Sequence, residues 1–342
     1  MKFRRINKGT AVFAVVAALS LIISAFNLTQ AASGARRKAE FRPEKKADKL
    51  FFFSKKTDLP KGAYIAKLHI RGVISELNNT YSQKWILDTI SNLRDDPNNK
   101  GILLFIDSPG GGVYESDEVY LALESYKKQT ERPVYAYFAS IAASGGYYIG
   151  CASDYIMANR NTLTGSIGVI AGQFTDLSQL MEKWGIKTTV IHSGRNKTLG
   201  NLSEPITPEQ RDIMQSISDE CYGQFTDIVA ESRSLSKEAV YEIADGRIYT
   251  ARQALENGLI DAIGSFDDLS DAMDRREFDF AGYEVTDLFY QREETLYDLI
   301  MGAARKLQRQ AEFPGCLPDA VRSVIEPEMS FPAYYYDSAH PY

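Results

Sequence analysis

The stretch GILLFIDSPGGGVYESDEVYLALESYKK, residues 101–128, decides the fold class of this chain. Its first part, Ile102–Ile106, is a short apolar run of the kind that forms a buried strand. Three consecutive glycines end the turn Asp107–Gly112 that follows, and apolar residues recur at helical spacing within Tyr114–Lys128. The order of strand, glycine turn and helix indicates one unit of an α/β fold.

Similar units lie on both sides of this stretch. We predict strands at 63–74, 102–106, 134–138, 155–158, 167–171 and 188–192, and helices at 82–94, 114–128, 147–152 and 207–232. The last helix begins with the capping box Thr207-Pro208-Glu209-Gln210. Strands separated by amphipathic helices imply parallel crossover connections. Residues 63 to about 270 are therefore predicted to form one α/β domain.

The composition of the 342 residues bounds the class of protein. The length fits two domains or one large α/β unit. Apolar residues make up 44% and charged residues 25%, which excludes wholesale disorder, collagen and a multi-span membrane protein. The first 39 residues contain seven basic and no acidic residues, so the net charge of −6 leaves −13 on the rest. Because an acidic body repels phosphate backbones, nucleic acid is not the expected partner.

Cysteine and histidine are too scarce for the common metal sites. The three cysteines form no C-x-x-C pair, and at most one disulfide can form among them. The three histidines have no second ligand type at a recognisable spacing, which excludes a zinc site of the H-E-x-x-H type. These residues are Cys151, Cys221, Cys316, His69, His192 and His340.

A single transmembrane helix that anchors the chain is predicted at the N-terminus, within residues 1–33. Four basic residues precede the uncharged run Ala11–Phe26, whose 16 residues would span ~24 Å as a helix. Extension from Gly9 to Leu28 gives roughly the ~30 Å of a bilayer core, with the basic start inside and the rest exported. A removable signal peptide, cleaved near Ser33-Gly34-Ala35, is the alternative.

Two further segments flank the predicted domain, which we place at residues 63–302. Residues 34–62 are polar, rich in lysine and arginine and broken by prolines, and are predicted to be a linker. The tail, residues 303–342, contains five prolines and the cluster Tyr334-Tyr335-Tyr336 but no sustained period. It is predicted to wrap a neighbour or to be disordered.

The glycine turn is the first candidate for chemistry. Three successive glycines within Asp107–Gly112 leave backbone N–H groups uncovered by side chains, which suits the stabilisation of an anion. A glycine-rich turn that only connects the strand to the helix is the structural alternative. A P-loop is excluded, because no Gly-Lys-Ser/Thr sequence follows.

The second candidate is Ser144, in the sequence Ala142-Ala143-Ser144-Gly145-Gly146 between a predicted strand and a predicted helix. A serine between small residues at such a junction can turn its hydroxyl outward, as in the nucleophile elbow of serine hydrolases. The start of the following helix would favour a developing oxyanion. A serine that merely caps the helix is the alternative.

A nucleophilic serine needs a base, and the sequence offers a lysine rather than a histidine. His69 lies within the first predicted strand, His340 in the tail, and His192 is only loosely placed. A Ser-Lys pair needs a lysine in a water-poor pocket, where the neutral amine can accept the serine proton. Lys197, in the loop Ser193-Gly194-Arg195-Asn196-Lys197, is the candidate. A solvated loop lysine is the alternative.

Together these motifs resemble the signal peptide peptidase A family of Ser-Lys membrane proteases, in its short single-domain form. Matching stretches run in the family's order from about residue 63 to 268: Asp107–Gly111, Ala143–Tyr148, Thr162–Val169, Ser193–Lys197 with Pro205–Glu209, and Asp245–Thr250 with Ala254–Gly264. The family has a further proline shortly after the lysine, where this chain has Leu202.

The resemblance implies a role for five residues. Ser144 falls on the family's nucleophile and Lys197 on its general base. Ser166 falls on the serine that hydrogen-bonds and orients the lysine, and Gly111 and Gly145 fall on the residues that supply the oxyanion N–H groups.

The resemblance also implies the architecture and the activity. We expect the Clp protease and crotonase fold, with stacked ββα units around a parallel sheet. The activity would be that of a serine endopeptidase on short hydrophobic peptides such as cleaved signal peptides, without a metal or organic cofactor. The protein would be single-pass in a bacterial cell membrane, with its catalytic domain on the extracytoplasmic side. A homo-oligomer with active sites at subunit interfaces is implied.

Two other functions fit the same fold. A crotonase-type acyl-CoA enzyme uses a similar pair of amides without a serine nucleophile, but its cytosolic substrates conflict with an export segment. A non-catalytic scaffold protein is the other alternative, and the presence of both Ser144 and Lys197 argues against it.

Overall fold

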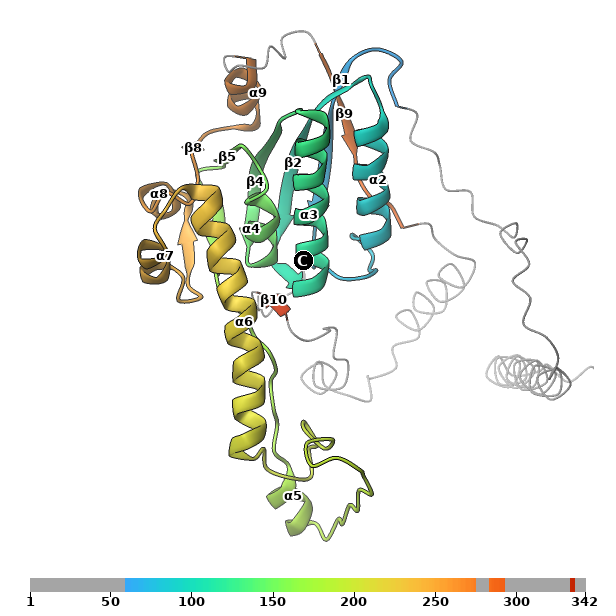
Figure 1. Ribbon diagram of the computed structural model, residues 1–342, viewed down its shortest axis with the longest axis vertical. Coiled ribbons are helices and arrows are strands. Elements are labelled where there is room, and N and C mark those ends of the chain that lie inside the picture. Colours follow the sequence, from blue (N-terminus) through green and yellow to red (C-terminus); the bar gives the residue numbers. More distant parts are fainter. Residues whose placement is uncertain (1–58, 275–282, 293–332, 336–342) are drawn as a thin grey trace, which may run out of the picture. The chain divides into compact units, whose positions relative to one another are not determined.

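The computed structural model describes residues 59–274, 283–292 and 333–335 (Figure 1). The helices in these residues are α2 (Gln83–Asp95), α3 (Val113–Thr130), α4 (Gly145–Gly150), α5 (Ser178–Lys183), α6 (Pro208–Arg233), α7 (Lys237–Ile243), α8 (Ala251–Glu256) and α9 (Phe266–Asp274). The strands are β1 (Tyr64–Arg71), β2 (Asn99–Ser108), β3 (Gly110–Gly112), β4 (Val134–Ala143), β5 (Tyr155–Ala158), β6 (Leu163–Gly165), β7 (Ile248–Thr250), β8 (Ala262–Ile263), β9 (Glu284–Leu288) and β10 (Ala333–Tyr335).

The main sheet is predominantly parallel. Within the described residues it has eight strands in the order β7-β6-β4-β2-β1-β9, with β5 paired to β4 and β8 paired to β5. All of these pairs are parallel except β6 with β7. Helices α2 and α3 lie over one face of the sheet (Figure 1). The predicted α/β fold with a parallel sheet is therefore confirmed.

Alternation along the strands builds a core on both faces of the sheet. In β1, Ala66, Leu68 and Ile70 belong to the larger apolar cluster, which includes residues of α2, α3, α4 and α6. Ile65 points to the other face and joins a smaller cluster that Leu269 of α9 completes. Successive strand residues alternate between faces, so an apolar run without polar interruptions is the sequence of a strand covered on both sides.

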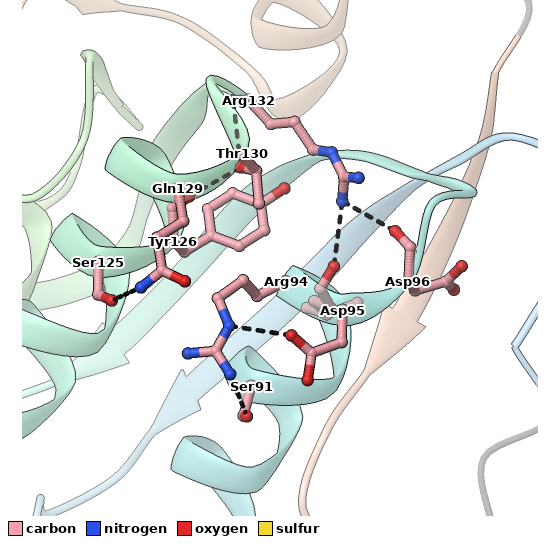
Figure 2. Close-up of polar contacts among 10 residues, drawn as sticks. Ser91, Arg94, Asp95, Asp96, Ser125, Tyr126, Gln129, Thr130 and Arg132 are labelled. Carbon is pink, nitrogen blue, oxygen red and sulfur yellow. Dashed lines mark hydrogen bonds and ion pairs between the residues drawn. The ribbon is translucent and has the colours of Figure 1, made fainter.

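Helices α2 and α3 end beside each other, and one arginine joins their C-terminal ends (Figure 2). Arg132 donates from Nη1 to the carbonyl oxygens of Leu93 and Asp96, at 3.2 and 2.8 Å. These are among the last carbonyls of α2, which have no partner inside the helix. The backbone N–H of Arg132 donates to Thr130 Oγ1 at the end of α3. The arginine therefore joins α2 to α3, the helix that follows the glycine turn.

Most predicted elements form, but two predicted strands do not. The strands predicted at 167–171 and 188–192 are absent from those residues. In the second segment Ile191 is 97% exposed, and no strand in the described part of the chain pairs with it. An apolar, β-branched run becomes a strand only where a sheet edge satisfies its backbone N–H and C=O groups. The prediction at 188–192 is wrong for that reason. The prediction at 167–171 is wrong because the carbonyls of Ile167 and Val169 accept from Gly246 N–H and Ser218 Oγ and not from a neighbouring strand.

Few of the predictions for the two ends of the chain can be compared with the structure. The predicted anchor at 1–33, most of the linker at 34–62 and most of the tail at 303–342 lie outside the described residues. In the part of the chain that the structure describes, none of the helices has the length and apolar character needed to cross a bilayer. The three described tail residues form β10, which sequence analysis did not predict.

Replacement of Arg132 by methionine is expected to lower the free energy of unfolding by about 1–3 kcal/mol, because two helix carbonyls lose a charged donor. Arg94→Met is the matched control, since within the described residues Arg94 bonds side chains alone, those of Ser91 and Asp95, at the surface of α2. This control should cost under about 1 kcal/mol. Urea denaturation measures both values. Equal losses would show that the carbonyl contacts of Arg132 stabilise the fold no more than the surface contacts of Arg94.

Candidate active site

Ser144 lies at the junction of β4 and α4 in a strained backbone conformation. Its φ of 52° and ψ of −119° lie where residues with a side chain are seldom found. The strain costs of order 1–3 kcal/mol and persists only where the surroundings enforce it. Here the N–H of Ser144 donates to the carbonyl of Gly165 on β6 at 2.8 Å, and its carbonyl accepts from Tyr148 in α4. The junction is therefore the sharp elbow that the sequence predicts.

The hydroxyl of Ser144 does not cap the helix that follows. It makes no capping hydrogen bond to α4, so the structure does not support the alternative of an N-cap serine. The side chain is buried, and its Oγ has no hydrogen-bond partner among the described residues. A buried hydroxyl without a partner costs about 1–3 kcal/mol. Strain and an unpaired hydroxyl at one residue mark a site that packing alone does not explain.

The three glycines of the turn form β3, and the peptide groups of the middle one, Gly111, face away from Ile74. The N–H of Ile74 donates to Gly110 O at 2.8 Å, and the N–H of Gly112 donates to Ile74 O at 2.9 Å. Peptide groups alternate along a strand, so the N–H and C=O of Gly111 point to the opposite side. A side chain is excluded here, because a Cβ on Gly111 would lie 1.9 Å from Ile74 O.

Gly111 and Gly145 lie close together. A Cβ built on Gly145 would be 3.3 Å from the backbone nitrogen of Gly111 and 2.3 Å from Ser116 Oγ. The N–H of Gly145 is also one of the first groups of α4, which have no acceptor within the helix. Two backbone amides thus lie beside the Ser144 elbow, which is the arrangement that oxyanion stabilisation requires.

Ser166 is a neighbour of Ser144 through the sheet. It follows β6 directly, and β6 pairs with β4 so that Gly165 lies opposite Ala143. Ser166 is buried, has a φ of 51°, and donates its N–H to the carbonyl of Arg247 at 2.8 Å. The structure therefore brings together four of the five predicted residues: Gly111, Ser144, Gly145 and Ser166.

Lys197 lies apart from this group. Its neighbours Arg195 and Asn196 both donate to Glu209 Oε1, at 2.6 and 3.1 Å, which fixes the loop to the first turn of α6. Farther along α6, Gln224 donates to the hydroxyl of Tyr148 in α4 at 2.7 Å. From Pro208 to Gln224 the helix rises by about 24 Å.

Figure 1 shows α5 at the opposite end of α6 from α4. We call residues 171–207 the arm, because they form the segment around α5 that precedes α6. The arm exposes large apolar side chains, including Trp184 at 75% and Ile191 at 97%. Lys197 itself is exposed. Within one chain the arm therefore holds Lys197 away from Ser144.

Three other residues that could supply a nucleophile or a base are disfavoured. Burial raises the pKa of the Cys151 thiol, at the end of α4, to about 12, so a reactive thiolate is not available there. His69 lies on β1 and bonds Asp287 on β9 at 2.6 Å; burial lowers the pKa of this imidazole, and the bond to Asp287 opposes that shift. His192 contacts Gly194 O within the arm.

One feature of the site was missed by sequence analysis. The tail strand β10 pairs with β3 in an antiparallel arrangement that places Tyr334 opposite Gly111. No pattern in the sequence links these segments, because the contact is made by glycine backbone. The tyrosine cluster marked the tail as unusual but did not predict that it pairs with β3.

Comparison with known proteins identifies the family. The model of peptidase family S49 matches residues 126–278. A protein of Enterococcus faecium named for signal peptide peptidase SppA is 37% identical over 220 residues, 62% of this chain and 63% of that protein. A protein of Synechocystis named as a protease is 40% identical over 204 residues, 60% of this chain and 71% of that protein.

Similarity to solved structures is weaker. A membrane-bound stomatin-specific protease is 16% identical, with a TM-score of 0.44, over 66% of this chain and 98% of that one. A TM-score of this size leaves the expected Clp protease and crotonase fold a prediction. The Synechocystis protein is 40% identical and is covered over 71% of its length, which shows the family. The chain belongs to peptidase family S49, the serine proteases related to signal peptide peptidase.

Proposed function

We propose that this protein is a serine endopeptidase in which Ser144 is the nucleophile and Lys197 the general base. The observation that carries the proposal is the buried Ser144 hydroxyl, held without a partner among the described residues on a strained elbow. Structural serines at helix starts normally cap the helix, and this one does not. The proposed substrates are short hydrophobic peptides such as cleaved signal peptides. The N-terminal segment is proposed to anchor the chain in a bacterial membrane, with the catalytic domain on the extracytoplasmic side.

The chemistry follows from the placement of the groups. Ser144 Oγ forms a bond to the carbonyl carbon of the peptide while its proton passes to the neutral amine of Lys197. The oxyanion accepts hydrogen bonds from Gly111 and Gly145. The C–N bond then breaks as the lysine ammonium protonates the leaving nitrogen, and water hydrolyses the acyl ester by the same route.

The proposed site is completed by a second copy of the chain. Within one chain the lysine loop is fixed to the first turn of α6, away from Ser144. The arm that holds the loop exposes Trp184 and Ile191, side chains whose burial against a neighbour would be favourable. Assembly would thus bring the lysine of one copy to the serine of the next. Ser166 is proposed to orient that lysine.

Replacement of Ser144 by alanine should reduce peptide cleavage by several orders of magnitude while leaving the fold intact, since its hydroxyl makes no bond within the described residues. Lys197→Arg should be as inactive as Lys197→Ala, because a guanidinium stays protonated and cannot act as a base. Lys187→Ala, at an exposed lysine of the same arm, is the matched control and should stay active.

Cleavage of a fluorogenic peptide and labelling by a fluorophosphonate measure the outcome. An active Lys197→Arg variant would remove Lys197 from the mechanism. A Ser144→Ala variant that keeps more than about a tenth of wild-type turnover would remove the proposed nucleophile.

The oxyanion role of Gly145 can be separated from its packing. Gly145→Ala should lower both the unfolding midpoint and kcat, because the new methyl group would lie 2.3 Å from Ser116 Oγ. The second change Ser116→Ala removes that oxygen and should restore much of the midpoint. It should not restore kcat, since the methyl group remains 3.3 Å from the Gly111 nitrogen.

The control for this pair is Gly223→Ala in α6, where a Cβ meets nothing within 4 Å. It should raise stability by roughly 1 kcal/mol, as alanine does in a helix interior. Full activity of the Gly145→Ala, Ser116→Ala double variant would show that the two glycine amides do not form the oxyanion site.

Mixing of inactive subunits tests whether the site is shared. Ser144→Ala and Lys197→Ala chains, each inactive alone, should regain activity when co-assembled, because some interfaces would pair an intact serine with an intact lysine. Equal random mixing in a cyclic ring should restore about a quarter of the sites. Co-expression with two tags, tandem purification and a peptide assay measure this. Absence of recovery in verified mixed oligomers would place both groups in one chain.

A further inference from the structure

Three helices meet at a closed set of side-chain hydrogen bonds. It consists of Asp117 in α3, Tyr148 in α4 and Gln224 in α6. The hydroxyl of Tyr148 donates to Asp117 Oδ1 at 2.6 Å. Gln224 Nε2 donates to the same oxygen at 3.0 Å and to the Tyr148 hydroxyl at 2.7 Å. We call these three side chains the triangle. Because each comes from a different helix, the triangle fixes how the three helices lie against one another.

Each of these helices carries one part of the proposed machinery. Helix α3 follows β3 directly, and Ser116 in its first turn donates to Gly112 O at 2.8 Å. Helix α4 follows Ser144, whose carbonyl accepts from the N–H of Tyr148 at 2.9 Å. Helix α6 holds the lysine loop at its first turn through the bonds to Glu209. The glycine strand, the serine elbow and the arm are thus joined at one point.

The packing around Tyr148 separates its two contacts with α6. Its ring is fully buried, 5.5 Å from the ring of Tyr120 in α3 and 5.0 Å from that of Phe225 in α6. A ring packed on both sides keeps its place in the core. Gln224, in contrast, is exposed. Its hydrogen bonds can therefore be removed while the apolar contact between α4 and α6 remains.

We propose that Gln224 is a positioning residue, which through Tyr148 and Asp117 sets the direction of α6 and thereby the place at which the arm presents Lys197. The inference rests on the proposed function, in which Lys197 is the base. From Pro208 to Gln224 the helix rises by about 24 Å, so a rotation of about 2° at Gln224 moves the lysine loop by about 1 Å. A misplacement of about 1 Å can cost about a hundredfold in rate.

Replacement of Gln224 by methionine in the full chain removes both of its bonds to the triangle. It should lower kcat about tenfold or more and change KM by less than about twofold, because the lysine moves and the peptide-binding groups do not. Gln215→Met is the matched control, an exposed glutamine of the same helix whose bond to Asp219, at 2.7 Å, stays within α6. It should leave kcat and KM unchanged.

Asp117 offers a rescue that separates positioning from packing. Asp117→Ala removes the oxygen that both Tyr148 and Gln224 use, and should lower kcat as Gln224→Met does. Asp117→Asn keeps an accepting oxygen at the same place and should keep most of kcat. The double variant Asp117→Ala, Gln224→Met should be no slower than the slower single variant, because residues that act as one unit do not add. Additive losses, or an Asn variant as slow as the Ala variant, would contradict the proposal.

Hydrogen exchange reports the triangle without catalysis. Peptides that cover residues 144–150 should exchange about fivefold faster in Gln224→Met than in the parent, the ratio that corresponds to one ordinary hydrogen bond. They should exchange at the parent rate in Gln215→Met. Equal exchange in the two variants would overturn the proposal.

Two further outcomes are separated by simple controls. Size-exclusion chromatography should show that Gln224→Met assembles as the parent does; loss of assembly, or a raised KM with an unchanged kcat, would overturn the positioning role. An active Lys197→Ala chain would overturn the proposed function and with it the part of the inference that concerns the lysine. The exchange measurement would then still decide whether the triangle fixes α6 to α4.

Discussion

Parallel pairing of β1, β2 and β4 is the constraint on which the site depends. In a parallel sheet the carboxyl ends of neighbouring strands lie at the same edge, so the segments that follow these strands meet. The register is close: Arg71 lies opposite Asp107 in the first pair, and Ser108 opposite Ala142 in the second. Ile74, the β3 glycines and Ser144 follow these positions within a few residues. Chemistry from separate parts of the sequence is thereby brought to one place.

The strained backbone of Ser144 and its hydroxyl, unpaired among the described residues, cost free energy, and the surrounding packing enforces this conformation. Every residue of α4 is buried, and Tyr147 and Tyr148 are among the largest fully buried side chains described. Tyr147 donates to Leu259 O at 2.8 Å, and the ring of Tyr148 lies 5.0 Å from that of Phe225 on α6. A helix fixed on all sides leaves Ser144, the residue that precedes it, no room to relax. The strain at Ser144 is thus stable because the core holds α4 in place.

Local sequence signals predicted the glycine turn and the sharp junction at Ser144, because each has a local physical cause. The glycines of the turn and the small residues around Ser144 are required by close backbone approach, and parallel topology then implies that they meet. The strand predicted at 188–192 failed because apolar content says nothing about whether a sheet edge is available. The pairing of β10 with Gly111 could not be predicted, since backbone pairing with glycine leaves no side-chain pattern.

On the proposed assignments, a single chain is inactive, because the arm keeps Lys197 away from the serine of its own chain. The base arrives only when copies assemble, so activity depends on protein concentration. A peptidase built in this way would be active only where assembled copies occur.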